Sequence, residues 1–177
     1  MGCFYSKIYP SEDEFKGAGC VFMSKTHILA GYQPKKRIAH ISGFGGKRQE
    51  GETFLVTAMR ETLEELLDIK DIPKKLISRI NETILPSKVI IRGSYILCIY
   101  SFRQLFGILH FAKDYLKKIP AYPSGVPESL DTLLLSRSIN PDSEISHICL
   151  LPILTRLRMD PFFLEDIGKI SEDLIDV

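Results

Sequence analysis

The 177-residue chain contains no tryptophan, few cysteines, no long apolar run and almost no excess of charge. No apolar run approaches the ~20 residues that a membrane helix needs. The 23 Lys and Arg residues nearly balance the 22 Asp and Glu residues, which argues against a generally basic surface for nucleic acid. The cysteines lie far apart, without a CxxC pair or zinc spacing, which favours thiols in a reducing compartment over a disulfide framework. We therefore expect a soluble, cytoplasmic protein. The four cysteines are Cys3, Cys20, Cys98 and Cys149.

The composition suits one globular domain with a hydrophobic core, because 45% of the residues are hydrophobic and no repeat or linker divides the chain. We expect a single domain over residues 1–177. Residue patterns predict strands at 17–24, 27–32, 37–41, 89–102 and 145–151. They predict helices at 54–67, 105–118, 127–137 and 161–175. Strands with a helix inserted among them, followed by more helices, indicate the α/β class, an α+β sandwich with a mixed β-sheet flanked by helices.

The N-terminus matches a short lipidation motif. Met1 to Ser6 fits the pattern M-G-x-x-x-[ST], in which Gly2 would be myristoylated and Cys3 could take a second acyl chain. The pattern is short and matches often by chance, so an ordinary N-terminus is the preferred interpretation. Membrane association is expected only if Gly2 is acylated, since two acyl chains anchor a protein stably and one does not.

The helix expected at 54–67 has one apolar face and one strongly charged face. Apolar residues recur in pairs every four positions, and Thr53 stands where an N-cap residue should be. On the opposite face, Glu61, Glu64 and Glu65 fall within about one turn. Three carboxylates so close repel one another by a few tenths of a kcal/mol per pair, and a divalent cation would offset that repulsion. Oxygen ligands of this kind suit Mg²⁺ or Mn²⁺ rather than zinc.

A wider pattern surrounds this carboxylate cluster. The segment from Gly46 to Glu65 reads G-x5-E-x7-R-E-x-x-E-E, which fixes six residues over twenty positions. It resembles the Nudix box, and the match includes every charged position of that family pattern. The resemblance implies a Nudix fold and a pyrophosphohydrolase. The implied reaction is attack of metal-activated water on a diphosphate linked to some other moiety.

The resemblance also implies which residues bind the metal. Glu64 and Glu65 are expected to be direct ligands of Mg²⁺ or Mn²⁺, together with the carbonyl oxygen of Gly45. Glu61 is expected to be a further ligand or the base that activates water.

Two further roles, and some departures, follow from the same comparison. Arg60 would hold Glu61 in place through a charge-assisted hydrogen bond, and Glu52 would orient the helix face from behind. Thr62 takes an aliphatic position of the pattern, Leu67 replaces the glycine that normally ends the helix, and Asp68 takes the last aliphatic place. Because that glycine serves as a left-handed C-terminal cap, we expect its loss to lengthen or re-aim the helix end.

Many Nudix enzymes use one more acidic residue from a late loop. Glu144 is the best candidate here, because it lies just before the strand expected at 145–151. An ordinary exposed loop glutamate is an equally good interpretation. Glu128 and Asp131 are weaker candidates.

The box residues predict cleavage of a diphosphate but do not identify the rest of the substrate. The segment Gly43 to Thr53 resembles the loop of MutT-type enzymes that hydrolyse oxidised purine nucleoside triphosphates. Those enzymes commonly carry a tryptophan after the late acid, and this chain has none. The prediction therefore stops at a nucleoside triphosphate or another nucleoside diphosphate derivative, with Lys47 and Arg48 as candidate substrate-binding residues.

Two other functions stay open. The same chemistry would permit hydrolysis of an mRNA cap, with a basic track for the RNA 5′ end provided by Lys35 to Arg37, Lys47, Arg48, Lys117 and Lys118. Alternatively, the domain could be a catalytically weak Nudix-fold module that binds a nucleotide or a protein. The presence of every box carboxylate favours an enzyme. The sequence leaves a homodimer open.

Overall fold

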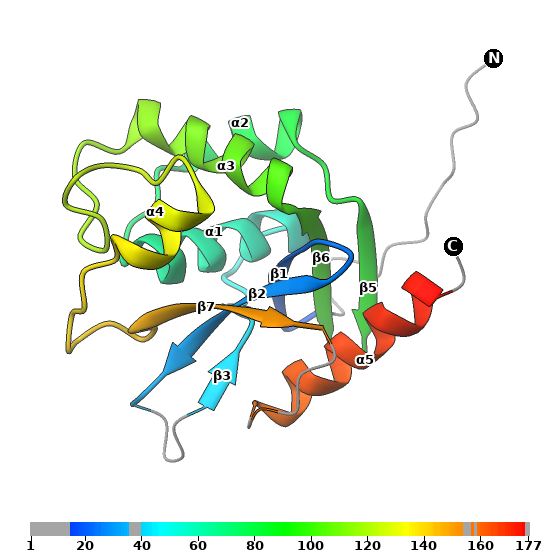
Figure 1. Ribbon diagram of the computed structural model, residues 1–177. Coiled ribbons are helices and arrows are strands. Elements are labelled where there is room, and N and C mark those ends of the chain that lie inside the picture. Colours follow the sequence, from blue (N-terminus) through cyan, green and yellow to red (C-terminus); the bar gives the residue numbers. More distant parts are fainter. Residues whose placement is uncertain (1–14, 36–39, 154–156, 158, 176–177) are drawn as a thin grey trace.

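The computed structural model describes residues 15–35, 40–153, 157 and 159–175. The lipidation motif at the N-terminus and the basic residues Lys36 and Arg37 lie outside the described residues. Within them, the strands form one mixed, seven-stranded sheet, with helices on both of its faces (Figure 1). This arrangement confirms the predicted mixed sheet flanked by helices.

The sheet is built around a parallel pair of strands at its centre. Strands β1 (Gly17–Met23) and β6 (Tyr95–Ser101) run parallel, with Gly17 opposite Tyr95, and the other strand pairs of this sheet are antiparallel. The order is β3-β2-β1-β6-β5, while β4 also pairs with β1 and β7 also pairs with β2. The remaining strands are β2 (His27–Gln33), β3 (His40–Ser42), β4 (Phe44–Lys47), β5 (Lys88–Arg92) and β7 (His147–Pro152).

Two hydrophobic cores lie on the two faces of this sheet, because side chains alternate along a strand. In β1, Cys20 and Phe22 point into the core beneath the first four helices, whereas Val21 and Met23 point into the core beneath α5. Figure 1 shows α5 alone on its side of the sheet. The helices are α1 (Phe54–Leu67), α2 (Lys74–Thr83), α3 (Phe102–Tyr115), α4 (Leu130–Leu135) and α5 (Pro161–Ile175).

Helix α1 begins where the sequence predicts. The Thr53 hydroxyl accepts a hydrogen bond from the backbone N–H of Val56 at 3.3 Å, so it satisfies one of the unpaired N–H groups of the first turn. The helix packs on β1 and β4, and buried residues such as Met59, Leu63 and Leu66 fix its rotation about its axis. The charged face is thereby turned toward β4.

The segment predicted as one strand over 89–102 is instead a hairpin followed by a helix. Strands β5 and β6 are separated by a turn in which Gly93 has φ of 53°, a conformation that favours glycine. Ser101 then ends β6 and caps α3 in a capping box with Gln104, so the helix begins at Phe102 and not at residue 105. β-branched and aromatic residues continue on both sides of this turn, so the sequence pattern predicts one long strand over 89–102.

Two elements were not predicted from the sequence. Helix α2 carries only a narrow apolar stripe, with Leu76, Ile77 and Ile80 buried, and its N-terminus has no side-chain cap. Strand β4 occupies the glycine-rich stretch itself, a composition that weakens strand signals. The helix predicted over 127–137 is shorter, since α4 spans Leu130–Leu135.

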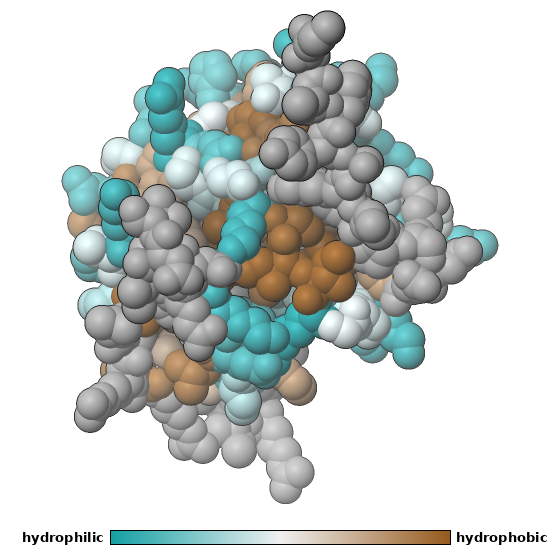
Figure 2. All heavy atoms as spheres, turned by 90° about the vertical axis from the view of Figure 1, so that its right-hand side faces the viewer, coloured by the Kyte–Doolittle hydropathy of each residue, from teal (hydrophilic) through white to brown (hydrophobic). Residues whose placement is uncertain are grey.

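Strand β5 and helix α5 form one side of the molecule, which Figure 2 shows with an apolar area bordered by hydrophilic side chains. Ile91 of β5 and Phe162 of α5 are both exposed hydrophobic residues, at 46% and 70% of their surface. In the part of the chain that the structure describes, no helix is long and apolar enough to cross a membrane.

Candidate active site

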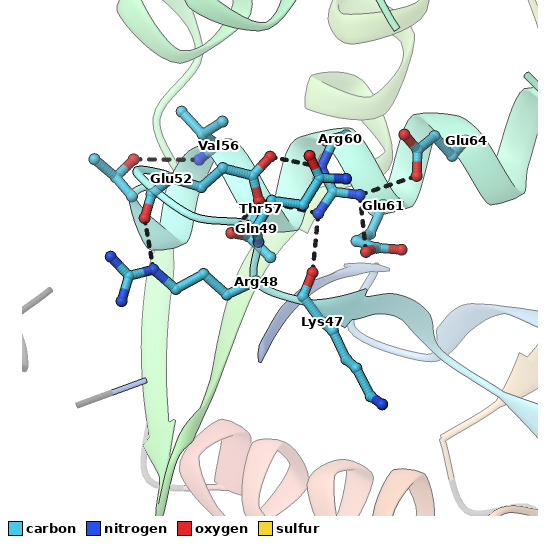
Figure 3. A network of polar contacts seen from close by, with 10 residues as sticks. Lys47, Arg48, Gln49, Glu52, Val56, Thr57, Arg60, Glu61 and Glu64 are labelled. Carbon is cyan, nitrogen blue, oxygen red and sulfur yellow. Dashed lines mark hydrogen bonds and ion pairs between the residues drawn. The ribbon is translucent and has the colours of Figure 1, made fainter. Parts of the chain in front are cut away.

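Arg60 holds the candidate site together by binding three carboxylates at once (Figure 3). Its Nε and Nη2 donate to the two oxygens of Glu52 at 2.6 and 2.9 Å, a bidentate pair. Its Nη1 donates to Glu61 at 2.8 Å and to Glu64 at 3.0 Å. Nη2 also donates to the carbonyl oxygen of Lys47 in β4 at 2.9 Å, which ties the helix to the glycine-rich strand. Hydrogen bonding to Glu52 is the main cause that raises the pKa of Arg60, so the guanidinium stays charged.

Glu52 anchors this network from the loop before α1. Its carboxylate accepts hydrogen bonds from the backbone N–H of Gln49 at 3.0 Å and from the Thr57 hydroxyl at 2.9 Å, besides those from Arg60. Burial by itself raises the pKa of Glu52, but these donors, with Arg60 first, outweigh it and hold the pKa below its usual value. Glu52 thus fixes the guanidinium of Arg60.

Glu64 has the opposite electrostatic environment. Burial raises the pKa of Glu64 above its usual value, and the neighbouring carboxylates of Glu61 and Glu52 add to this, against the lowering effect of Arg60. The ionised form of Glu64 is thus held at a cost in free energy that a nearby cation would reduce.

Glu65 is held by the glycine-rich strand. The backbone N–H of Gly45 donates to Glu65 Oε2 at 2.8 Å. Gly45 has φ of 150°, and a Cβ there would collide with the hydroxyl of Tyr95 and with the backbone of Gly19. Only glycine therefore allows β4 to approach β1 and the helix so closely.

Glu61 lies directly against the next glycine. A Cβ added at Gly46 would overlap the carboxylate of Glu61, with the Cδ atom 2.5 Å away. The first glycine of the box is therefore required for space, because the Glu61 carboxylate packs onto its backbone. Glu52, Arg60, Glu61 and Glu64 form one network, and Gly45 and Glu65 lie beside it as the sequence predicts.

The residues of the site fit a hard divalent cation in chemistry, although they are arranged around Arg60. Among the described residues, no three His, Cys, Asp or Glu side chains are grouped as a metal site. Glu52, Glu61 and Glu64 instead surround the guanidinium of Arg60. The donor set of carboxylate and peptide oxygens is the one that Mg²⁺ and Mn²⁺ prefer, and the glycines of β4 let the carboxylates of Glu61 and Glu65 lie against its backbone.

A cavity of about 560 Å³ opens beside this site, between the sheet and the first half of α5. Gly45 and Tyr95 form its wall next to the carboxylates, and Glu144 also lines it, so the structure brings the predicted late acid to the same cavity. The far wall includes Asp160, whose side chain caps α5 by accepting from the backbone N–H groups of Phe162 and Phe163 at 2.9 and 3.1 Å.

The end of α1 differs from the expectation. The helix is not lengthened: it ends at Leu67, and Asp68 adopts the left-handed conformation at φ 56° and ψ 45°. Asn140 Nδ2 donates to Asp68 Oδ2 at 2.8 Å and holds the residue there. Aspartate tolerates this conformation better than most residues, so it replaces the missing glycine one position later.

The remaining candidates lie apart from the Arg60 network or turn away from it. The Lys47 side chain is exposed and extends away from the carboxylates (Figure 3), while Arg48 donates to the Glu52 carbonyl at 3.0 Å and packs over the Phe15 ring. Glu128 forms an exposed ion pair with Lys113 of α3, and Asp131 lies in the first turn of α4. The structure thus gives Glu144, rather than Glu128 or Asp131, a place beside the site.

Sequence reasoning missed two residues that contact the site. Tyr95 lines the cavity, and burial first, then the nearby Glu65 carboxylate, raise the pKa of its phenol. Arg137 donates to the backbone carbonyl of Glu65 at 3.1 Å. Neither residue belongs to a motif, and only the strand pairing and the chain path beyond α4 bring them to α1.

Comparison with known proteins finds similarity in structure alone. No family model and no curated protein matches the sequence. The chain resembles solved Nudix hydrolase structures.

One of these structures is a bifunctional NMN adenylyltransferase/ADP ribose pyrophosphatase from Francisella tularensis, complexed with AMP and a manganese ion. It is 15% identical to this chain with a TM-score of 0.47, and the alignment covers 94% of this chain and 43% of that chain. A NUDIX hydrolase from Nitrosomonas europaea is 13% identical with a TM-score of 0.44, covering 90% of each chain. A mutT/nudix family protein from Listeria innocua is 16% identical with a TM-score of 0.43, covering 94% of this chain and 96% of that one.

This chain spans less than half the length of the Francisella protein. At these identities and TM-scores, the activity of this chain has to be inferred from its own side chains.

Proposed function

We propose that this chain is a metal-dependent Nudix hydrolase that cleaves a diphosphate linkage in a nucleoside triphosphate or another nucleoside diphosphate derivative. One observation carries the proposal: a single guanidinium, Arg60, gathers Glu52, Glu61 and Glu64 beside the glycine-rich strand that holds Glu65. Three partly buried carboxylates around one guanidinium carry an excess of negative charge, which a divalent cation would offset.

Glu61, Glu64, Glu65 and the carbonyl oxygen of Gly45 would hold Mg²⁺ or Mn²⁺. When bound, the cation would lower the pKa of a water ligand and neutralise charge on the leaving diphosphate. Holding it requires Glu64 to turn away from Arg60, and the raised pKa of Glu64 indicates that the carboxylate gains from a second positive neighbour. Arg60, fixed by Glu52, keeps Glu61 oriented throughout.

The base that takes the proton from water has two candidates. Glu61 is fixed by Arg60 and lies against Gly46, so its position is well defined. Glu144 lines the cavity together with Gly45, whose backbone N–H binds Glu65. A general base must lie within hydrogen-bond reach of the water, directly or through one more water.

The cavity favours a nucleoside as the other moiety. Its lining combines aromatic residues such as Tyr95 and Phe163 with polar groups such as Gln33, and the buried Ser42 hydroxyl has no hydrogen-bond partner among the described residues. An aromatic base with polar edges can satisfy both kinds of surface, and mixed apolar and polar linings are typical of such ligand sites. The cavity volume of about 560 Å³ is within the range typical of small-molecule sites.

A free nucleotide is favoured over capped RNA. A long RNA needs a track of basic side chains for its backbone. Of the basic residues next to the Arg60 network, Arg48 is committed to the Glu52 carbonyl and the Phe15 ring, and Lys47 extends away from the carboxylates (Figure 3).

The test is a substrate panel of nucleoside triphosphates, dinucleotides, nucleotide sugars and capped RNA, assayed with Mg²⁺ or Mn²⁺ and analysed for products. The wild type is compared with Glu64→Gln and with Glu82→Gln, a matched loss of one exposed helical carboxylate on α2. We expect nucleotide turnover that Glu64→Gln abolishes and Glu82→Gln leaves unchanged. Turnover of capped RNA alone would support the decapping alternative, and metal and nucleotide binding without any turnover would support a binding module.

A further inference from the structure

All four carbonyl groups at the C-terminal end of α1 have hydrogen-bond partners. The last carbonyl groups of a helix run out of donors within the helix and must be satisfied by other means. The Glu64 carbonyl accepts from the backbone N–H of the C-cap residue Asp68 and from that of Ile69 at 3.1 Å, and the Leu67 carbonyl accepts from that of Ala121 at 3.3 Å. The two carbonyls between them, those of Glu65 and Leu66, both accept from one side chain, Arg137.

Arg137 also binds a second segment of the chain. Its Nη2 donates to the Glu65 carbonyl at 3.1 Å and to the Ile145 carbonyl at 2.8 Å, while Nη1 donates to the Leu66 carbonyl. A single nitrogen therefore bridges a residue of α1 and a residue of the segment before β7. The guanidinium also lies over the ring of Tyr122, 5.7 Å from its centroid, which limits its freedom further.

The two bridged residues are significant because of their neighbours. Glu65 is itself one of the carboxylates of the site, and Ile145 directly follows Glu144, which lines the cavity beside it. Ile145 is 1% exposed and packs against Gly31, and the next residue, Ser146, donates its N–H to the Tyr32 carbonyl at 3.0 Å. The segment is therefore fastened to β2 on one side and to α1 through Arg137 on the other.

We propose that Arg137 is a positioning residue of the reaction, which fixes the backbone of Glu65 relative to that of Glu144. This inference rests on the proposed function, in which both glutamates act on the same metal-bound substrate. Arginine suits the task because its planar fork reaches three carbonyls in fixed directions, and its charge interacts favourably with the negative end of the helix dipole. Neither Arg137 nor its bridge involves a side chain of the Nudix pattern.

The role predicts an effect on metal binding as well as on rate. Residues that orient ligands from behind typically change metal affinity or activity by roughly 10–100-fold when lost. For Arg137→Met we expect the Mn²⁺ dissociation constant to rise about tenfold and kcat to fall about tenfold, with KM for the nucleotide at saturating metal changed less than about twofold. Arg137→Lys should recover part of this loss, because one ammonium can reach one or two of the three carbonyls.

The experiment measures Mn²⁺ binding to the substrate-free protein by electron paramagnetic resonance, alongside steady-state kinetics and urea unfolding. The matched control is Gln104→Ala, which removes the side-chain bonds to Ser101 and to the Leu85 carbonyl at the start of α3, remote from the site. Gln104→Ala should lose stability with unchanged Mn²⁺ binding and kcat. If Arg137→Met loses stability but keeps wild-type Mn²⁺ affinity and kcat, Arg137 is only structural and the inference fails while the proposed function stands. If the wild type itself neither binds Mn²⁺ nor turns over nucleotides, both fail together.

Discussion

At the scale of single residues, Arg60 and its three carboxylate partners form a charged group that is largely shielded from water. The guanidinium is 9% exposed and its three carboxylate partners are between 12% and 22% exposed, so these charges are mostly removed from water. Removing one partner from such a group is more costly than the net value of the pair, because the remaining charges stay desolvated. The arrangement therefore preserves a defined position for each carboxylate at some expense in stability.

The first prediction concerns Gly46, onto which the Glu61 carboxylate packs. In Gly46→Ala the added Cβ must displace that carboxylate, so we expect turnover to fall about a hundredfold, the scale of losing a positioned acid–base group. The free energy of unfolding should fall by about 1–3 kcal/mol, because the displaced carboxylate loses its hydrogen bond to the largely desolvated Arg60. Steady-state kinetics and urea unfolding measure the two effects. Wild-type turnover in Gly46→Ala would show that the position of Glu61 does not matter.

The second prediction concerns the pH dependence of stability. Because the pKa of Glu52 is lowered in the folded protein, its contribution is fully present above the ordinary glutamate pKa of about 4.3 and is lost as the pH falls through the lower folded value. We expect the wild type to lose more free energy of unfolding than Glu52→Gln between about pH 6 and pH 3. Urea unfolding across that range measures it. Parallel pH profiles for the two proteins would rule out this role for Glu52.

At the scale of elements, the helices with strong periodicity were predicted, whereas helix α2 with its narrow apolar stripe and strand β4 were missed. The α1 pattern, its Thr53 cap and the extent of α5 were predicted as observed, because an apolar stripe and a cap are local signals. Strand β4 could not be predicted, since glycine residues give no strand signal and only pairing with β1 makes them extended. The closeness of Glu61, Glu64 and Glu65 followed from helix periodicity, and the places of Glu52 and Gly45 followed from the family resemblance. Tyr95 and Arg137 reach the site through sheet pairing and the path after α4, which no local pattern records.

The third prediction concerns helix α5, which covers the cavity side of the sheet. Gly168 lies within this helix and is exposed, and outside the backbone of its own helix no atom of the described residues lies within 4 Å of the position that a Cβ would take. Gly168→Ala should therefore raise the free energy of unfolding by about 0.5–1 kcal/mol, because alanine loses less backbone entropy on forming a helix. Urea unfolding measures this change, and turnover should stay at the wild-type level. A loss of stability would mean that the helix needs glycine at this position.

At the scale of the whole molecule, the two cores place the site at the edge of the layers rather than inside one of them. Helix α1 belongs to the core on one face of the sheet and α5 to the core on the other, and the cavity lies between α5 and the strands beside Gly45. The carboxylates are therefore fixed by the first core, while the far wall of the cavity belongs to the second. A ligand that spans both parts would be positioned by the sheet between them.

The fourth prediction concerns stabilisation of the fold by metal. A cation that binds only the folded protein adds RT ln(1 + [L]/Kd) to its stability, about 2.7 kcal/mol at a hundred times Kd. Mn²⁺ should therefore raise the Tm of the wild type with increasing concentration, and should raise that of Glu64→Gln much less. Differential scanning calorimetry of both proteins, with Glu82→Gln as the control, measures this. Equal increases in all three would place the cation elsewhere on the protein.

The most direct test of the account is nucleotide hydrolysis in ¹⁸O-labelled water with Mn²⁺, comparing the wild type with Glu64→Gln under conditions in which both remain folded. The account predicts that the wild type releases products of diphosphate cleavage with one labelled oxygen incorporated per turnover, and that the rate falls about a hundredfold or more in Glu64→Gln. Turnover at an equal rate in both proteins, or nucleotide and Mn²⁺ binding to the wild type without any incorporation of label, would contradict it.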